Sequence, residues 1–382
     1  MTPFGSRPEA GTRRLAVAAV DEALKDSGVP TEDIARIFYA NAAAGVVSSQ
    51  EMIRGQVALR NHALARVPVI NIENACASGS SAVNLAFHTI RSGAAEVAIA
   101  MGVEQLNHED KSRPFNALRG STDIDEIGEG TPGEIAANSV LMEYYAAVAQ
   151  EYLDTTGATP RDFALVAVKN RHHAAENPLA HFRKPQTAEE VLTARMVSPP
   201  LTLPMCSPLT DGAAALVLCS EAYAQRFDGP TIEILASEIA PGTGRESNPV
   251  GDAASAAYRA SGYGPWDFDL IELHDAAAPA ELTQYGEIGL CEPGRGYELI
   301  RAGVTSLGGR MPVNTSGGLL SRGHPLGATG CAQLVELCTQ LRGRAGGRQV
   351  ANAKLAMAVN GGGWLDGTYA VSVATIVRRR TS

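Results

Sequence analysis

Hydrophobic and polar positions along the chain follow two periods, one typical of amphipathic helices and one typical of strands. Residues 12–28 place Leu and Val at helical spacing and end at Gly28, which predicts a helix. Apolar runs predict strands at 34–41, 67–72 and 96–102, the last two buried, and a helix is expected over 77–93. Alternating strands and helices favour a parallel sheet with helices on both faces.

The second half of the chain repeats this plan. Its pattern predicts strands at 231–238, 268–273, 354–359 and 369–377, and a helix at 328–342. The order of turn, glycine-rich helix start, helix and apolar strand surrounds Cys76 and recurs around His324. This repetition indicates an internal duplication.

The segment between the halves differs in composition. It is richer in charged residues and Pro, with helical patches expected at 133–153 and 160–176. We therefore predict three parts: an N-terminal half formed by 1–107 and 206–228, an inserted loop domain at 108–205, and a C-terminal half at 229–382.

Composition limits the kinds of partner. The chain has 382 residues, 45% of them hydrophobic and 19% charged, which is typical of a globular protein with more than one core. The net charge of −9 argues against nucleic acid as the main partner. No run of about 18 apolar residues predicts a membrane span, and the first residues lack a signal-peptide layout. We expect a cytoplasmic protein.

The six cysteines form no CxxC pair, so neither a zinc ribbon nor a redox motif is expected, and we predict no metal site. Cys76 stands apart because it follows a predicted buried strand and opens a Gly- and Ser-rich helix. A helix N-terminus carries partial positive charge, which lowers a thiol pKa and favours the nucleophilic thiolate. The alternative is an inert buried cysteine.

Three motifs resemble the thiolase superfamily over nearly the whole chain: NACASG at 74–79, CSPLTDGAAA at 206–215, and NTSGGLLSRGHPLGATG at 314–330. His274 and Asp275 resemble the His-Asp motif of the sterol-carrier-protein-X class, where degradative and biosynthetic thiolases have Asn-Glu-Ala-Phe. The resemblance implies a five-layered αβαβα fold with two similar halves. It also implies dimers or dimers of dimers, and coenzyme A as substrate or product rather than a bound cofactor.

The resemblance assigns roles to three side chains. Cys76 would carry the acyl group, and His324 would be its general base, which needs a pKa near neutrality. His274, at the end of an apolar strand, would donate to the oxyanion. Asp275 would orient loops or His274; its alternative is a turn former, and for His324 the alternative is a solvated loop residue.

A second oxyanion hole is expected from backbone N–H groups. Cys76 would supply one by resemblance, and the turn containing Asn360, Gly361 and Gly362 would supply the other, because glycine lets backbone approach a ligand closely. The alternative for these glycines is a plain hairpin turn before the last strand.

The chain departs from the family in two places. Thiolases carry a second reactive cysteine either before the late glycines or after the His-Asp pair, and this chain has Asn360 and Ala276 there. Cys291 and Cys331 are expected to be core residues instead. Family members also have a strand before the Thr2–Gly5 turn. Either the sequence starts late, or this strand is missing and the sheet is short at one edge.

Basic residues in the middle segment are candidates for holding coenzyme A phosphates by charge, namely Lys111, Arg113, Arg183 and Lys184; the alternative is a solvated loop face. Ser316 and Gly317 are further candidates for substrate contact. His172 and His173 are expected on a helix surface.

Three functions remain open. The first is a thiolase that cleaves a 3-oxoacyl-CoA or condenses acyl-CoAs, on an unusual or bulky acyl group such as an aromatic one, with a small zinc-ribbon/OB-fold accessory subunit as a candidate partner. The second is an acyltransferase or retro-aldolase relative that transfers the acyl group to a non-CoA acceptor. The third is a non-catalytic subunit of a hetero-oligomer.

Overall fold

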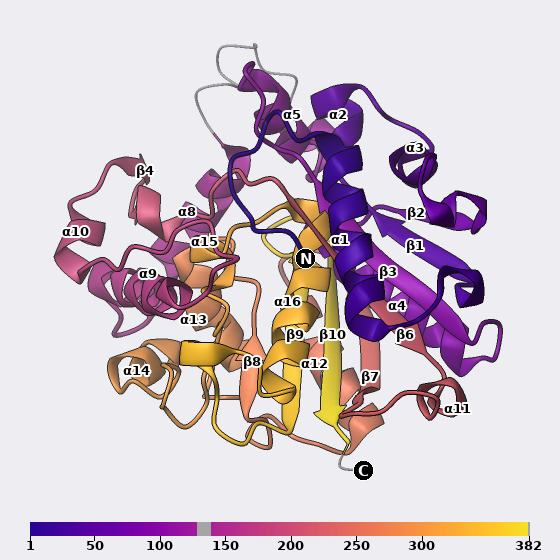
Figure 1. Ribbon diagram of the computed structural model, residues 1–382. Coiled ribbons are helices and arrows are strands. Elements are labelled where there is room, and N and C mark those ends of the chain that lie inside the picture. The colour runs from indigo at the N-terminus through magenta and orange to yellow at the C-terminus, as the bar shows by residue number, and fades with distance from the viewer. Residues whose placement is uncertain (128–138, 381–382) are drawn as a thin grey trace.

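The computed structural model describes residues 1–127 and 139–380 and has two central sheets (Figure 1). The first sheet has the order β2-β1-β3-β6, with β2 and β3 parallel to β1 and β6 antiparallel to β3. Its strands are β1 (Arg36–Ala40), β2 (Val69–Ile72), β3 (Val97–Glu104) and β6 (Gly212–Cys219). β2 was expected to be buried, but it is the edge strand and its side chains are half-buried or exposed.

The second sheet has the order β7-β10-β9-β8, with β8 parallel to β9 and β10 antiparallel to both neighbours. Its strands are β7 (Ile232–Pro241), β8 (Leu270–Glu272), β9 (Leu355–Gly362) and β10 (Val371–Arg379). Each sheet therefore mixes parallel and antiparallel pairs, and the two sheets come from the two halves of the sequence.

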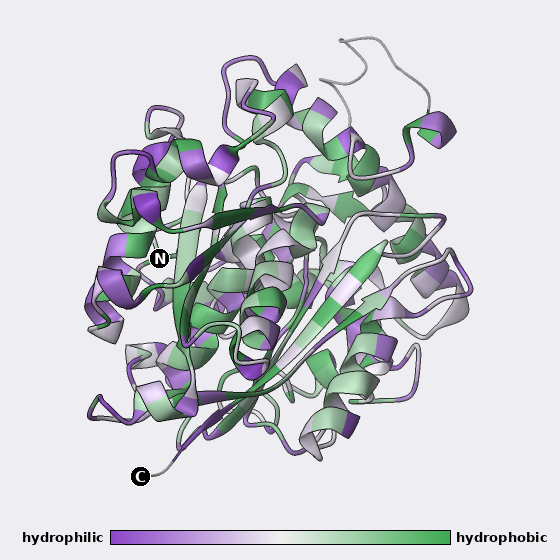
Figure 2. Cartoon of the chain, turned by 90° about the vertical axis from the view of Figure 1, so that its right-hand side faces the viewer, coloured by the Kyte–Doolittle hydropathy of each residue, from purple (hydrophilic) through white to green (hydrophobic). Residues whose placement is uncertain are grey.

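Helices α4 (Ser78–Arg91) and α16 (Leu326–Leu341) lie between the sheets and contact strands of both. α1 (Gly11–Ser27) and α3 (Arg54–Leu59) cover the outer face of the first sheet, and α12 (Pro249–Ser261) covers the second. The chain thus has the five-layered αβαβα order expected from the motifs. Hydrophobic residues dominate the strands of the two central sheets (Figure 2).

The middle segment forms a peripheral group of helices, drawn at the left and top of Figure 1. Its elements are α5 (Ser112–Arg119), α6 (Ile124–Ile127), α8 (Val140–Thr155), α9 (Pro160–Ala175), α10 (Ala188–Leu192), β4 (Met196–Ser198) and β5 (Leu201–Thr202). The start of the helix expected at 133–153 lies outside the described residues. The proposed domain boundaries remain a prediction.

Helix α9 packs on the second half of the chain, against α13 (Ala278–Glu287), α14 (Gly296–Arg301) and α15 (Gly318–Ser321). Lys169 of α9 forms a buried ion pair with Glu281, at 2.7 Å. The expectation that His173 lies on a helix surface is wrong: its ring is buried, with Nδ1 at 3.0 Å from the Asn314 carbonyl. His172 is exposed as expected.

The first turns of α4 and α16 cross in direct backbone contact. A Cβ added at Gly79 would meet the carbonyl of Gly327, and one added at Gly330 would collide with the backbone nitrogen of Ser80. Because glycine has a hydrogen atom in place of a side chain at these two positions, the two helix starts can touch. Each helix start follows one of the two candidate catalytic residues. Within residues 1–127 and 139–380, no helix has the length and apolar character required to cross a membrane.

Gly330→Ala tests this crossing. Alanine normally favours a helix over glycine by about 1 kcal/mol, but here the new methyl group would push α16 away from α4. We expect a net loss of about 1–3 kcal/mol in the free energy of unfolding, measured by urea denaturation. Gly120→Ala is the control, because a Cβ there would meet nothing closer than the Ala117 carbonyl, at an ordinary contact distance of 3.4 Å. An unchanged or raised midpoint for Gly330→Ala would contradict the crossing.

Candidate active site

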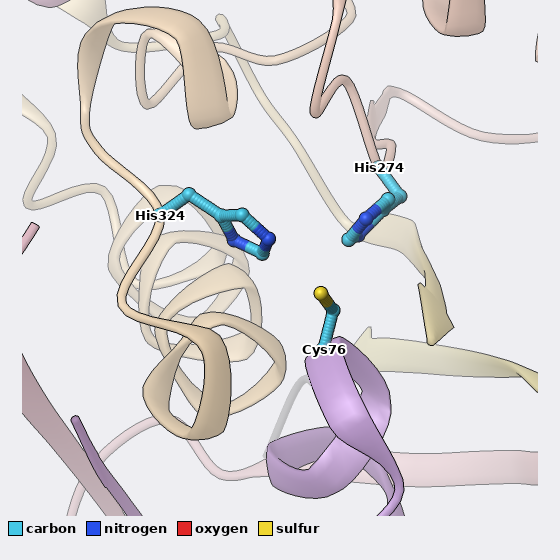
Figure 3. Close-up of side chains that lie close together, drawn as sticks. All are labelled: Cys76, His274 and His324. Atoms are coloured by element: carbon cyan, nitrogen blue, oxygen red, sulfur yellow. The ribbon is translucent and has the colours of Figure 1, made fainter. Parts of the chain in front are cut away.

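The structure brings Cys76, His274 and His324 together from three distant parts of the chain. The Cys76 sulfur and one nitrogen of each ring lie within 4.8 Å of one another. Both imidazole rings point towards the sulfur (Figure 3). Their ring centroids are 5.1 Å apart, with an angle of 82° between the planes. All three side chains are buried, with 7% of Cys76, 1% of His274 and 5% of His324 exposed.

Cys76 lies in a single 3₁₀ turn, Ala75–Ala77, directly before α4. The turn is held from both sides: the Asn74 amide donates to the Ser78 hydroxyl at 2.8 Å, and the Ala77 amide donates to the Asn74 carbonyl. Ala75 has a φ of 47°, in the left-handed region that non-glycine residues rarely adopt. This tight turn directs the sulfur away from α4 and towards the two rings.

Burial raises the pKa of the Cys76 thiol to about 12, and the carboxylates of Glu104 and Glu73 add to the increase. The backbone N–H of Cys76 acts in the opposite direction but is weaker. The helix N-terminus was expected to favour the thiolate, and that expectation is wrong for the free protein. Because the thiol is neutral at physiological pH, attack requires a base that takes its proton.

His324 lies in the loop before α16. Its Nδ1 is 2.7 Å from the hydroxyl of Thr329, one turn into that helix, while its Nε2 is buried without a hydrogen-bond partner. Burial, and then the neighbouring His274 and Arg322, hold the pKa of His324 well below its usual value. The expectation of a pKa near neutrality is therefore wrong for the free protein. The ring is neutral at physiological pH.

His274 follows β8, and its backbone is fixed by the side chain of Gln284. The Gln284 amide donates to the His274 carbonyl at 2.7 Å and accepts from its N–H at 3.0 Å. The ring Nδ1 is 2.8 Å from the side-chain amide nitrogen of Asn360. Burial lowers the pKa of His274 to about 3, so this ring is neutral as well.

The late glycines belong to a strand rather than to a turn. Asn360, Gly361 and Gly362 all lie in β9, paired with β10. A Cβ at Gly362 would collide with the carbonyl of Asn74 in the Cys76 turn. The absence of a side chain therefore places the backbone of β9 against the turn that carries the nucleophile candidate.

Two buried carboxylates hold the loops of the site. Asp275 accepts from the backbone N–H groups of Leu319 and Leu320, at 2.7 and 3.3 Å, so it holds the start of α15, the short helix before the His324 loop. Glu104, at the end of β3, accepts from the Gly327 N–H at 3.1 Å and from the loop after β1. Sequence reasoning missed Glu104, although an acidic residue closing an apolar strand was a usable signal.

The two halves of the chain match known family models. Residues 1–193 match the thiolase N-terminal domain and residues 243–375 match the thiolase C-terminal domain-like model. The chain belongs to the thiolase family. Relatives that match over nearly their whole length are named as an acetyltransferase and as a thiolase subunit.

Several named relatives of this thiolase-family chain cover most of its length. It is 37% identical over 373 residues to benzoylsuccinyl-CoA thiolase subunit BbsB of Thauera aromatica, covering 95% of this chain and 93% of the relative. It is 35% identical over 381 residues to an acetyl-CoA acetyltransferase of Methanothermobacter thermautotrophicus, covering 97% and 96%.

Two further similarities are partial or structural. The chain is 35% identical over 368 residues to sterol carrier protein 2 of Bos taurus; the match covers 91% of this chain but only 65% of that longer protein. The solved structure titled Ltp2-ChsH2(DUF35) aldolase superposes with a TM-score of 0.78 and 24% identity, covering 98% of this chain and 95% of the solved one. This last match supports the fold alone.

Two of the predicted substrate-contact residues, Ser316 and Gly317, lie in closely packed surroundings. Ser316 is fully buried and its hydroxyl donates to Glu272 at 2.5 Å, while a Cβ at Gly317 would meet Ala174 of α9. Both residues lie in the packed scaffold beneath the His324 loop. Their role in substrate contact remains a prediction.

The four candidate cations are all exposed. Lys111 and Arg113 flank the start of α5. Arg183 and Lys184 follow a segment that pairs with the loop before His324, since the Phe182 N–H donates to the Ser321 carbonyl at 2.9 Å. Two of them already have partners, since Arg113 is paired with Asp110 at 3.8 Å and Arg183 donates to the Ala175 carbonyl at 3.2 Å.

A small apolar cluster surrounds Cys76, and sequence reasoning missed it. Buried members are Ala43, Val47, Leu106, Leu118 and Leu326, with Phe115, Leu141 and Leu209 partly buried beside them. They come from both helical and loop segments far apart in sequence, so no local pattern could have grouped them. The cluster is an apolar surface next to the thiol.

The same three side chains also offer one sulfur and two nitrogen atoms to a metal ion. Such donors suit transition metals, so the absence of a metal in the working enzyme stays a prediction.

The neutral state of Cys76 can be tested by alkylation. A pKa of about 12 means that the thiolate fraction, and hence the iodoacetamide reaction rate, should rise about tenfold per pH unit from roughly pH 7 to pH 10 without a plateau. Peptide mass spectrometry would follow Cys76, with half-buried Cys291 as the internal comparison. A plateau near neutral pH would show a preformed thiolate–imidazolium pair and contradict this.

Proposed function

We propose that this thiolase carries its acyl group on Cys76 and uses His324 as the base that activates the thiol. The observation that supports this most directly is the unpartnered, buried Nε2 of His324, which belongs to a cluster that places the sulfur within 4.8 Å of a ring nitrogen. A neutral thiol beside a neutral imidazole remains uncharged until a substrate binds. Proton transfer and attack can then occur together.

The first half-reaction follows from these positions. His324 Nε2 takes the proton of the Cys76 thiol while the sulfur attacks the acyl carbonyl. The resulting oxyanion accepts hydrogen bonds from His274 and from backbone N–H groups at the Cys76 turn and β9. When the carbonyl re-forms, the leaving group departs and His324 returns the proton to it. Acyl-Cys76 remains.

In thiolytic cleavage the substrate is a 3-oxoacyl-CoA and the leaving group is carbon. The C2–C3 bond breaks, its electrons form the enolate of the shortened CoA thioester, and the His324 imidazolium protonates that α-carbon. Coenzyme A then attacks acyl-Cys76 and gives its thiol proton to His324. The Cys76 sulfur departs and takes that proton back from His324, and the new acyl-CoA is released. The reverse sequence is the Claisen condensation.

The surroundings support a CoA thioester with an apolar acyl group, including a bulky or aromatic one. The cluster around Phe115 and Leu209 provides an apolar surface beside the sulfur. The exposed cations Lys111, Arg113, Arg183 and Lys184 would attract the phosphates of coenzyme A. Coenzyme A enters as substrate and product in this scheme.

A second candidate is acyl transfer from CoA to a non-CoA acceptor. It is favoured by one observation: Asn360 and Ala276 occupy the places where other thiolases have a second reactive thiol. Such a reaction needs no separate acid or base for an α-carbon.

We also propose that the enzyme works as a dimer, or dimer of dimers, in the cytoplasm. All six cysteines are free, which fits a reducing compartment. The Thauera relative is named a subunit, so a second chain, such as a small zinc-ribbon/OB-fold protein, is a candidate partner. Gel filtration of the chain expressed alone, and of the chain co-expressed with a candidate partner protein, would test this.

The acyl-enzyme can be detected by mass spectrometry. After incubation with acetyl-CoA, the acetyl adduct should map to Cys76. Cys76→Ala should abolish it, while Cys219→Ala, at the far end of β6, should retain it. His324→Ala should slow its formation by about 10²–10⁴-fold. An adduct on another residue, or full-rate acylation without His324, would contradict the assignment.

Cleavage of acetoacetyl-CoA distinguishes the two candidates. A thiolase should consume it only when free coenzyme A is added, giving two molecules of acetyl-CoA, which chromatography would quantify. If acyl-Cys76 forms from acetyl-CoA but longer and aromatic 3-oxoacyl-CoAs are also left intact, transfer to another acceptor is the better account.

A further inference from the structure

Asn360 occupies one of the positions where the family motif has a second reactive cysteine, and both ends of its side-chain amide have hydrogen-bond partners. It is 1% exposed and lies between the helix of the nucleophile candidate and the ring of His274. The Ser80 hydroxyl, in the first turn of α4, lies 2.9 Å from Asn360 Oδ1 and 2.9 Å from the Ala77 carbonyl, so its single proton is shared between these two acceptors. Asn360 Nδ2 in turn lies 2.8 Å from His274 Nδ1.

The direction of these hydrogen bonds decides where His274 carries its proton. With its oxygen towards Ser80, Asn360 presents an N–H to His274, and Nδ1 must accept. The single proton of the neutral ring then resides on Nε2. The opposite amide orientation would place the proton on Nδ1 and leave Nε2 bare.

The neighbouring ring favours the first arrangement. The Thr329 hydroxyl donates to the Pro325 carbonyl at 3.0 Å, so His324 Nδ1 is the donor to Thr329 and its buried Nε2, which has no partner, is bare. A second bare nitrogen beside it would add an unsatisfied buried acceptor, which is costly in a low-dielectric site. An N–H on His274 gives the site one acceptor and one donor.

We propose that Asn360 is a positioning residue that holds His274 in its Nε2–H tautomer, so that His274 donates to the oxyanion and cannot act as a base. This rests on the proposed acyl transfer at Cys76. It also means that His324 is the base for every proton transfer at this site. The asparagine thus replaces the missing thiol by fixing a donor rather than by moving protons.

The groups that face His274 leave this tautomer uncharged. They are His324, Cys76 and Tyr369, whose ring centroid is 5.5 Å away, with Tyr145 bonded to the Tyr369 hydroxyl at 3.2 Å. The pKa of both tyrosines is raised by burial, so they are neutral too. The adjacent Asp275 carboxylate is directed to the Leu319 and Leu320 amides instead.

Asn360→Asp tests the tautomer directly because a carboxylate can only accept. Nδ1 must then become the donor, and the charge raises the pKa of His274 from its buried value. Below the new pKa both nitrogens carry protons and Nε2–H is present; as the pH rises through that pKa, Nε2 becomes bare. The variant should therefore acylate Cys76 about 100-fold more slowly than the natural protein at alkaline pH, and the deficit should shrink as the pH falls.

The readout is the ratio of variant to natural acylation rates across pH, with acetyl-CoA as the probe. Asn360→Leu, which offers no polar partner, should give a loss whose ratio does not change with pH. A pH-independent ratio for Asn360→Asp as well would overturn the proposal. In the natural protein, ¹⁵N NMR of His274 should show protonated Nε2 and bare Nδ1, and the reverse pattern would also overturn it.

These outcomes are separable from failure of the proposed function. If the natural protein never forms acyl-Cys76, the acyl-transfer scheme fails, while the NMR experiment still determines the tautomer. If the adduct forms and the pH ratio of Asn360→Asp is flat, the scheme stands and the role of Asn360 is wrong.

Discussion

The backbone contact between the first turns of α4 and α16 is the constraint on which the rest of the site depends. Each helix begins just after one candidate residue, Cys76 or His324, and each belongs to a different half of the duplicated plan. Because Gly79 and Gly330 lack side chains, the two helix starts cross without a spacer. A few ångströms of separation here would place the sulfur out of reach of the imidazole.

Burial then sets the chemistry. Enclosing a thiol and two imidazoles away from water makes every charged form costly, so all three groups are neutral in the free protein. A charged pair would be more reactive towards any electrophile, whereas a neutral trio reacts when a substrate supplies the oxyanion that the donors stabilise. The fixed loops, tied by Asp275 and Glu104, keep this geometry without substrate.

The sequence predicted much of this fold, for identifiable reasons. Apolar runs and glycine stops were sufficient for α1 and for the strands around Cys76 and His324, and the motifs singled out the three side chains that the structure brings together. The predicted pKa values of Cys76 and His324 were wrong, because the sequence shows that a helix begins beside each residue but does not show how deeply each side chain is buried. His173 was misplaced because its partner, the Asn314 loop, lies 141 residues away. Asn360–Gly362 was predicted to be a turn, because its pairing with β10 depends on how the chain folds and cannot be seen in the local sequence.

The central claim is that the acyl group resides on Cys76 between the two histidines. A crystal structure of the protein trapped with an acyl-CoA tests it most directly. The account predicts continuous density from the Cys76 sulfur to an acyl group, with the acyl oxygen within hydrogen-bond distance of His274 Nε2 and a backbone N–H. An acyl group on another side chain, or an acyl oxygen directed away from both histidines, would contradict it.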